Sequence, residues 1–120
     1  MNAEERAKAL LKGAGMLVYE PGQQTGTCKV PYAVVHCFGE YPMIQGQRLR
    51  YALLTIHCYV PLDGNQTESL VSLAGRVSAV MRGMYNQAKP TGREGVDMIE
   101  PDFRALSRTI EYQTLKVQKG

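Results

Sequence analysis

Residues 49–60, with the sequence LRYALLTIHCYV, constrain the fold of this chain more than any other stretch. Successive side chains of a β-strand point to opposite faces of the sheet, so even and odd positions form separate surfaces. After Arg50, the even positions are all small or aliphatic: Ala52, Leu54, Ile56, Cys58 and Val60. The odd positions mix apolar, aromatic and polar side chains: Leu49, Tyr51, Leu53, Thr55, His57 and Tyr59. We therefore predict a long strand whose even face packs on helices and whose odd face is buried by a loop of the chain or by a partner.

The middle of the chain carries the pattern of an amphipathic helix. Apolar side chains recur three and four residues apart, which places them in one stripe along a helix: Leu70, Leu73, Ala74, Val77, Val80, Met81 and Met84. Asp63 or Asn65 can cap the first turn, and Asn65 followed by Glu68 resembles a capping box. We predict a helix over about 65–86.

The remaining elements complete an α+β fold. Good helix formers over 3–13 predict an N-terminal helix, which ends at a glycine. A short apolar piece follows at 16–19, and residue composition predicts strands at 30–38, 96–99 and 107–117. Gly, Pro and polar residues predict loops at about 21–29, 39–48 and 87–95. The expected fold is a single domain, 1–120, with a small, mainly antiparallel sheet of four to five strands and two α-helices packed on one face.

Composition places the chain among ordinary globular proteins. It has 120 residues, a net charge of +3 and a pI of about 8.8, which is a weak signal for nucleic-acid binding. The opening residues have mixed charge and no apolar core, so we expect no signal peptide. The most apolar stretch, 51–62, is too short to span a bilayer as a helix, and we expect no membrane association. Three cysteines, an odd number without paired spacing, argue against a disulfide framework and favour reduced thiols.

The dipeptide His-Cys occurs twice, at the end of VVHC and of TIHC, and raises the question of a metal or catalytic site. Strand alternation sends His36 and Cys37 to opposite faces, and likewise His57 and Cys58. No CxxC or HxxxH spacing supplies further ligands. Four acids around the sequence DMIEPDF, from Glu94 to Asp102, lack calcium-loop spacing and are typical of a solvated rim or a subunit contact. We expect no enzyme, no metal and no cofactor.

The odd face of the strand at 49–60 is the best candidate for an interface. Aromatic side chains of this kind are enriched at protein–protein contacts. The alternative is that one of the predicted loops, 21–29 or 39–48, folds across it. The span 69–93 adds four bases and no acid, and we place Arg82 and Lys89, seven residues apart, on one helix face for contact with an acidic partner or DNA. The candidate subunit or partner interface is Arg48, Tyr51, Leu53, His57, Tyr59, Arg82 and Lys89.

The order of these elements resembles the tail-terminator proteins of long-tailed bacteriophages, also called tail-completion or head-to-tail joining proteins. The likeness covers about 3–117. After the N-terminal helix it consists of VPYAVVHCFGE, then LRYALLTIHCYVP, then NQTESLVSLAGRVSAVMRGMY and finally GVDMIEPDFRALSRTIEYQTLKV, which includes Tyr112. The likeness lies in the order of the elements and in their residue pattern, rather than in a diagnostic motif.

The resemblance implies a non-enzymatic virion protein that is assembled in the host cytoplasm. Such a protein forms a homo-oligomeric ring, expected to be hexameric, at the head-proximal end of the tail tube. The ring stops tube polymerisation and docks the neck, so the implied partners are further copies of the chain, the tail tube protein and a neck or head-completion protein. DNA is implied only as cargo passing through the lumen. A neck adaptor or head-closure protein is a close alternative, and a small metal-dependent intracellular enzyme is a more distant one.

Overall fold

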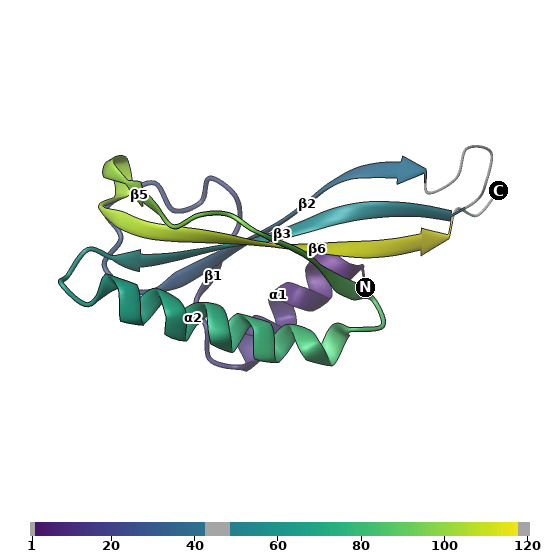
Figure 1. The fold of residues 1–120 in the computed structure, drawn as a ribbon, viewed down its shortest axis with the longest axis horizontal. Coiled ribbons are helices and arrows are strands. Elements are labelled where there is room, and N and C mark those ends of the chain that lie inside the picture. Colours follow the sequence, from purple (N-terminus) through teal and green to yellow (C-terminus); the bar gives the residue numbers. More distant parts are fainter. Residues whose placement is uncertain (1, 43–48, 118–120) are drawn as a thin grey trace.

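The fold is taken from a computed structural model that describes residues 2–42 and 49–117. Within these residues the chain forms two α-helices, two short 3-10 helices and six strands (Figure 1). In chain order they are α1 (Ala3–Gly13), β1 (Val18–Tyr19), β2 (Tyr32–Pro42), β3 (Leu49–Pro61), α2 (Gln66–Met81), η1 (Arg82–Met84), β4 (Ala88–Glu94), β5 (Met98–Glu100), η2 (Pro101–Phe103) and β6 (Ala105–Val117).

The strands form one sheet in the order β1-β2-β3-β6-β4, and β5 pairs with the beginning of β6. All pairs are antiparallel except β1 with β2. The predicted α+β class is therefore confirmed. The described part of the chain has six strands, slightly more than the four to five expected, because β4 lies where we predicted a loop.

Both helices lie on one face of this sheet, which we call the helix face (Figure 1). The core between them contains the even side chains of β3, of which Leu54, Ile56, Cys58 and Val60 are fully buried. Leu11 of α1 and Leu70 of α2 pack into the same core. Burying one such side chain contributes about 1.5–3 kcal/mol, so the alternation in β3 is a principal source of stability.

The predicted helix at 65–86 is shorter than expected and begins without the expected cap. Asn65 occupies the N-cap position, but its side chain makes no capping hydrogen bond, so the capping-box prediction is wrong. Its backbone N–H instead donates to Asp63 Oδ1 at 2.9 Å. The α-helix ends at Met81, and the next three residues form the 3-10 helix η1, which places Met84 in the core.

The two other differences from the sequence prediction concern loops that are partly strands. Residues 88–94 form β4 within the loop predicted at 87–95, although Pro90 cannot donate to a ladder. Pro90 is tolerated because β4 lies at the edge of the sheet and pairs only with β6. In the loop predicted at 39–48, the backbone of β2 continues to Pro42 after a register shift between Phe38 and Tyr41. Residues 43–48 lie outside the described residues.

The sheet is longer than the helix layer. Figure 1 shows the far ends of β2, β3 and β6 beyond both helices, and the molecule measures 51 × 26 × 25 Å along its principal axes. The register of this part pairs Tyr41 with Tyr51 and Leu49 with Val117. The backbone at this end therefore forms a three-stranded extension.

The buried stripe of α2 predicts that a charge at Leu73 prevents folding. Leu73 is 4% exposed, and a buried unpaired carboxylate costs several kcal/mol, a large part of the stability of a domain of this size. We expect Leu73→Asp to lack a cooperative thermal transition by circular dichroism. The matched control is Val71→Asp on the same helix, where the side chain is 55% exposed. If both variants melt like the wild type, the placement of α2 is wrong.

Candidate functional site

A hollow of about 290 Å³ opens on the sheet face opposite the helices, which we call the outer face. It lies where the chain passes around the edge of the sheet after β1. One wall comes from β2 and β3, and the other comes from the segment 20–28, which we call the strap. The lining residues are Glu20, Pro21, Gly22, Gln24, Thr25, Tyr32, Val34, His36, His57, Tyr59 and Phe103.

Aromatic rings form the floor of one end of the hollow. The rings of Tyr32 and Tyr59 stack with centroids 5.0 Å apart, and Phe103 meets Tyr59 edge-on at 6.3 Å. These residues belong to a second, smaller core that includes the buried side chains of Cys28 and Ala105. Such aromatic pairs contribute about 0.5–1.5 kcal/mol beyond their burial. This part of the outer face is therefore packed by the chain itself.

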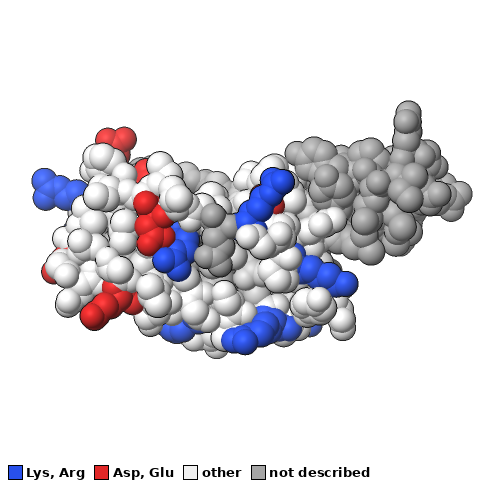
Figure 2. All heavy atoms as spheres, in the orientation of Figure 1, with Lys and Arg blue, Asp and Glu red and all other residues white. Residues whose placement is uncertain are grey.

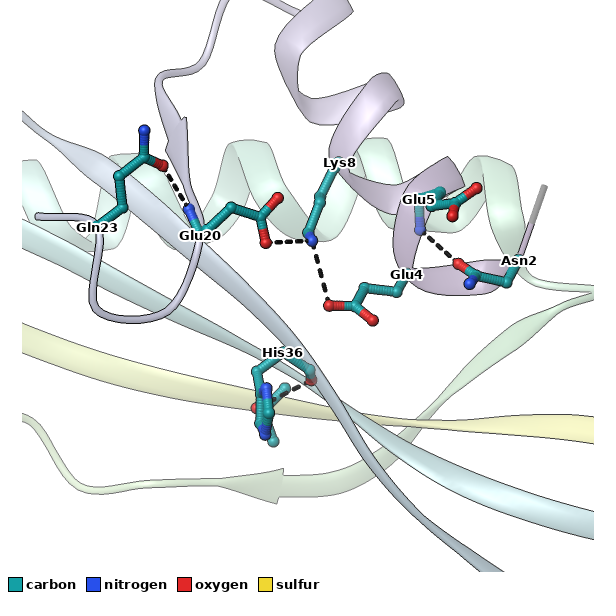
Figure 3. Close-up of polar contacts among 8 residues, drawn as sticks. Asn2, Glu4, Glu5, Lys8, Glu20, Gln23 and His36 are labelled. Atoms are coloured by element: carbon teal, nitrogen blue, oxygen red, sulfur yellow. Dashed lines mark hydrogen bonds and ion pairs between the residues drawn. The ribbon is translucent and has the colours of Figure 1, made fainter.

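The strap is held at both ends. At its C-terminal end, the backbone N–H of Cys28 donates to the carbonyl of Phe103 at 2.6 Å. At its beginning, Lys8 of α1 contacts Glu20 at 2.6 Å and Glu4 at 3.1 Å, and Gln23 Oε1 accepts from the backbone N–H of Glu20 (Figure 3). Partial burial lowers the pKa of Lys8, but the two carboxylates outweigh it and the net shift is upward. The ion pairs thus link α1, on the helix face, to the strap.

His57 lies in the hollow with both ring nitrogens in contact with hydroxyls. Its Nδ1 lies 2.8 Å from Thr109 Oγ1, and its Nε2 lies 3.3 Å from Thr55 Oγ1. Thr55 in turn donates to the backbone carbonyl of His36 at 3.3 Å. Burial lowers the pKa of His57, the neighbouring His36 lowers it further, and Glu100 opposes both. The imidazole is therefore neutral near pH 7.

The hollow brings together only part of the interface predicted from sequence. His57 and Tyr59 line it, and Leu53 is half-buried farther along the same face of β3. Tyr51 belongs to β3, but its side chain is outside the described part of the structure, and Arg48 lies outside the described residues altogether. Near Tyr59 the structure follows the predicted alternative, because part of the predicted loop 21–29 folds across this face of the sheet.

Arg82 and Lys89 do not share a helix face, so that prediction is wrong. Arg82 begins η1, whereas Lys89 belongs to β4, because the helix ends before the predicted seven-residue spacing is complete. Lys89 Nζ is 5.2 Å from the ring centroid of Tyr85, and Arg82 and Tyr85 both line a groove of about 380 Å³ between α2, β4 and β6.

Figure 2 shows how charges are distributed on one face. Lys and Arg side chains gather along the lower side, over α2 and the segment that follows it. Asp and Glu gather mainly at the end where β5 and the beginning of α2 lie. In the acid group, Asp97 is paired with Arg108 at 2.7 Å, and this hydrogen bond lowers the pKa of Asp97. Of the four acids predicted to form a solvated rim or a subunit contact, Asp97 is therefore paired within the chain.

The His-Cys dipeptides divide between the two faces, as alternation predicts. Cys58 is buried in the main core and Cys37 packs against it, whereas His36 and His57 line the hollow. Burial raises the pKa of the Cys28 thiol, which disfavours the thiolate required for nucleophilic attack. Within residues 2–42 and 49–117, no group of three His, Cys, Asp or Glu side chains is placed to hold a metal ion.

The sequence reading missed Phe103 and Glu20 as members of the site. Phe103 follows a predicted edge strand, and nothing local indicates that it reaches Tyr59, 44 residues away in sequence. The pattern at 30–38 did contain a signal, because Tyr32, Val34 and His36 alternate with core residues just as Tyr59 and His57 do.

Comparison with protein-family models and with curated proteins found no match to this chain. Among the described helices, none is both long enough and apolar enough to cross a membrane.

Truncating Tyr59 should destabilise the protein. The ring is half-buried between Tyr32 and Phe103, so we expect Tyr59→Ala to cost about 2 kcal/mol, somewhat less than for a fully buried aromatic residue. Urea unfolding measures this change, and Tyr85→Ala is the control because Tyr85 is 54% exposed. Equal stability of the two variants would contradict the second core.

The lowered pKa of His57 predicts a loss of stability in acid. The unfolded chain, with a histidine pKa of about 6.5, binds the proton more tightly than the folded chain. The free energy of unfolding should therefore fall as pH decreases below about 6.5. We expect His57→Gln to lose less stability than wild type between pH 7.5 and pH 5 in urea unfolding. His36→Gln removes a neighbour that lowers the pKa of His57, so its loss should lie between those of His57→Gln and wild type. Identical profiles for wild type and His57→Gln would contradict the assignment.

Proposed function

We propose that this chain is a structural virion protein, a tail terminator that forms a ring, expected to be hexameric, at the head-proximal end of a phage tail tube. The ring stops polymerisation of the tube and docks the neck. The observation that carries the proposal is the long outer face of β2, β3 and β6, which continues beyond the helix layer and is covered by the strap at one end only (Figure 1).

Two features of the sheet support a ring. Its edges are formed by different elements, β1 and β2 on one side and β4 and β5 on the other, and β1 pairs only with Ala33 and Val34 of β2. A ring requires a heterologous contact, in which one surface of a subunit meets a different surface of the next. Exposed sheet edges readily add a strand from another chain. The chain thus offers two unlike surfaces on opposite sides.

The proposed partners follow from the same architecture. Further copies of the chain form the ring, a tail tube protein contacts one side of it and a neck or head-completion protein contacts the other. DNA passes through the lumen as cargo. A neck adaptor or head-closure protein is the alternative function, and it differs in binding the head portal rather than the tube.

Purified protein mixed with preassembled tail tubes tests the proposal. We expect negative-stain images to show rings at one end of each tube, and native mass spectrometry to show a closed oligomer. Binding to portal-bearing heads but not to tubes would support the neck adaptor instead. A monomer at every concentration that binds neither structure would contradict both functions.

A variant of the outer face separates ring formation from folding. Leu53 is half-buried beyond the strap-covered part of β3, so we expect Leu53→Glu to remain folded and to reduce tube capping by at least about tenfold, because an interfacial charge is then left unpaired. Thr67→Glu, at an exposed position of α2, is the matched control and should cap tubes normally. Circular dichroism confirms folding of both variants.

A further inference from the structure

Exposed apolar side chains are concentrated at β5. Val96, Met98 and Ile99 are 80%, 55% and 63% exposed, whereas the other large apolar side chains that are exposed in the described residues stand apart from one another in the sequence. The registers of β4 and β5 against β6 differ by one residue, so the edge bulges between the two strands, at Val96. Single exposed apolar residues are normal, but a group of them marks a contact site. We call Val96, Met98 and Ile99 the β5 corner.

The backbone of β5 has a free side as well. β5 pairs with β6 on one side, and among the described strands none pairs with its other side. Such an edge readily adds a strand from another chain. Met98 pairs with Ser107 on the outer face and Ile99 pairs with Leu106 on the helix face. An added strand would therefore meet apolar side chains on both faces of the sheet.

The opposite edge of the sheet has a complementary surface, which we call the β1 edge and which consists of Leu17, Tyr19, Lys29 and Val30. Leu17 and Val30 are exposed, and β1 pairs only with β2. A groove of about 610 Å³ borders Tyr19 and is lined also by Lys29 and Val30. Lys29 is the only charged residue among the described residues that line this groove, whereas Asp102 is exposed directly after β5. The two edges therefore match in apolar character and differ in the sign of their charge.

The two edges also lie at the same level of the sheet. The registers of β1, β2, β3 and β6 place Val18 in one row with Arg108, and Met98 pairs with Ser107, the residue before Arg108. β1 runs parallel to β2, and each later pair up to β5 is antiparallel, so β1 and β5 run in opposite directions. When two copies stand side by side in the same orientation, β5 of one copy meets β1 of the next copy as an antiparallel pair.

We propose that β5 of one copy adds to β1 of a second copy, so that the β5 corner packs on the β1 edge and Asp102 comes toward Lys29. Every apolar side chain of both surfaces is then removed from water, which is the main favourable contribution to such a contact. The contact joins unlike surfaces, so its repetition closes a ring. The inference rests on the proposed function for the closed ring, and it names the subunit contact of that ring.

Sedimentation equilibrium of the full-length protein tests the contact. The corner variant carries Met98→Lys and Ile99→Lys, and the edge variant carries Leu17→Lys and Val30→Lys. We expect each double variant to associate at least about tenfold more weakly than wild type, because a lysine at a buried contact is left without a partner charge. The matched control carries Val71→Lys and Tyr85→Lys, which also replace two exposed apolar residues, and should associate as wild type does. All six positions are exposed, so circular dichroism should show the wild-type fold in each variant.

Mixing the two double variants tests whether the contact joins unlike surfaces. The corner variant keeps an intact β1 edge, and the edge variant keeps an intact β5 corner. We therefore expect the equimolar mixture to form a dimer of one copy of each and no larger species, although neither variant associates alone. Loss of association in the corner variant but not in the edge variant would show that β5 pairs with β5 of the other copy, and would overturn the proposal.

The remaining outcomes separate this contact from the proposed function. A wild type that is monomeric at every concentration, or a corner variant that associates as wild type does, would overturn the contact. Rings formed normally on tail tubes by the corner variant would leave the proposed function standing and place the subunit contact on another surface. A corner variant that associates normally but does not bind tubes would make β5 the site for the tube protein instead. Wild-type association that the double variants and their mixture affect as expected, without any capping of tubes, would support the contact and contradict the function.

Discussion

The pairing of β3 with β2 on one side and with β6 on the other is the interaction on which the rest of the structure depends. It places the even side chains of β3, from Ala52 to Val60, in the centre of one face, where α1 and α2 cover them. The same pairing fixes which residues share the outer face, because side chains of paired residues lie on the same side. A register slip by one residue would exchange the two faces of β3 and bury His57.

The outer face differs along its length, and this difference matters for function. At the β1 end the strap, held by Lys8 and by the carbonyl of Phe103, encloses the hollow with its aromatic floor. At the other end the three long strands extend past the helices (Figure 1). One chain therefore carries both the hollow and a long sheet extension. The proposed ring uses this polarity, since a ring of identical subunits needs two unlike surfaces.

Most of the fold could be predicted from local patterns. The alternation at 49–60 and the stripe from Leu70 to Met84 predicted the two elements that form the core, because both patterns record which side chains leave water. β4 could not be predicted, since Pro90 and its neighbours have poor strand propensity and become a strand only through pairing with β6. Lys89 was misplaced for the same reason, because helical spacing from Arg82 was applied to a residue that belongs to β4.

The candidate site could likewise be predicted only in part from local patterns. The sequence by itself determined the class of the fold, the burial of Cys58 and the outward position of His57, because strand alternation depends only on neighbouring residues. Only the tertiary structure decided that Glu20, Tyr59 and Phe103 enclose one hollow. Their meeting depends on the strap passing around the edge of the sheet and on η2 turning back toward β3, and contacts between such distant segments leave no periodic signal along the chain.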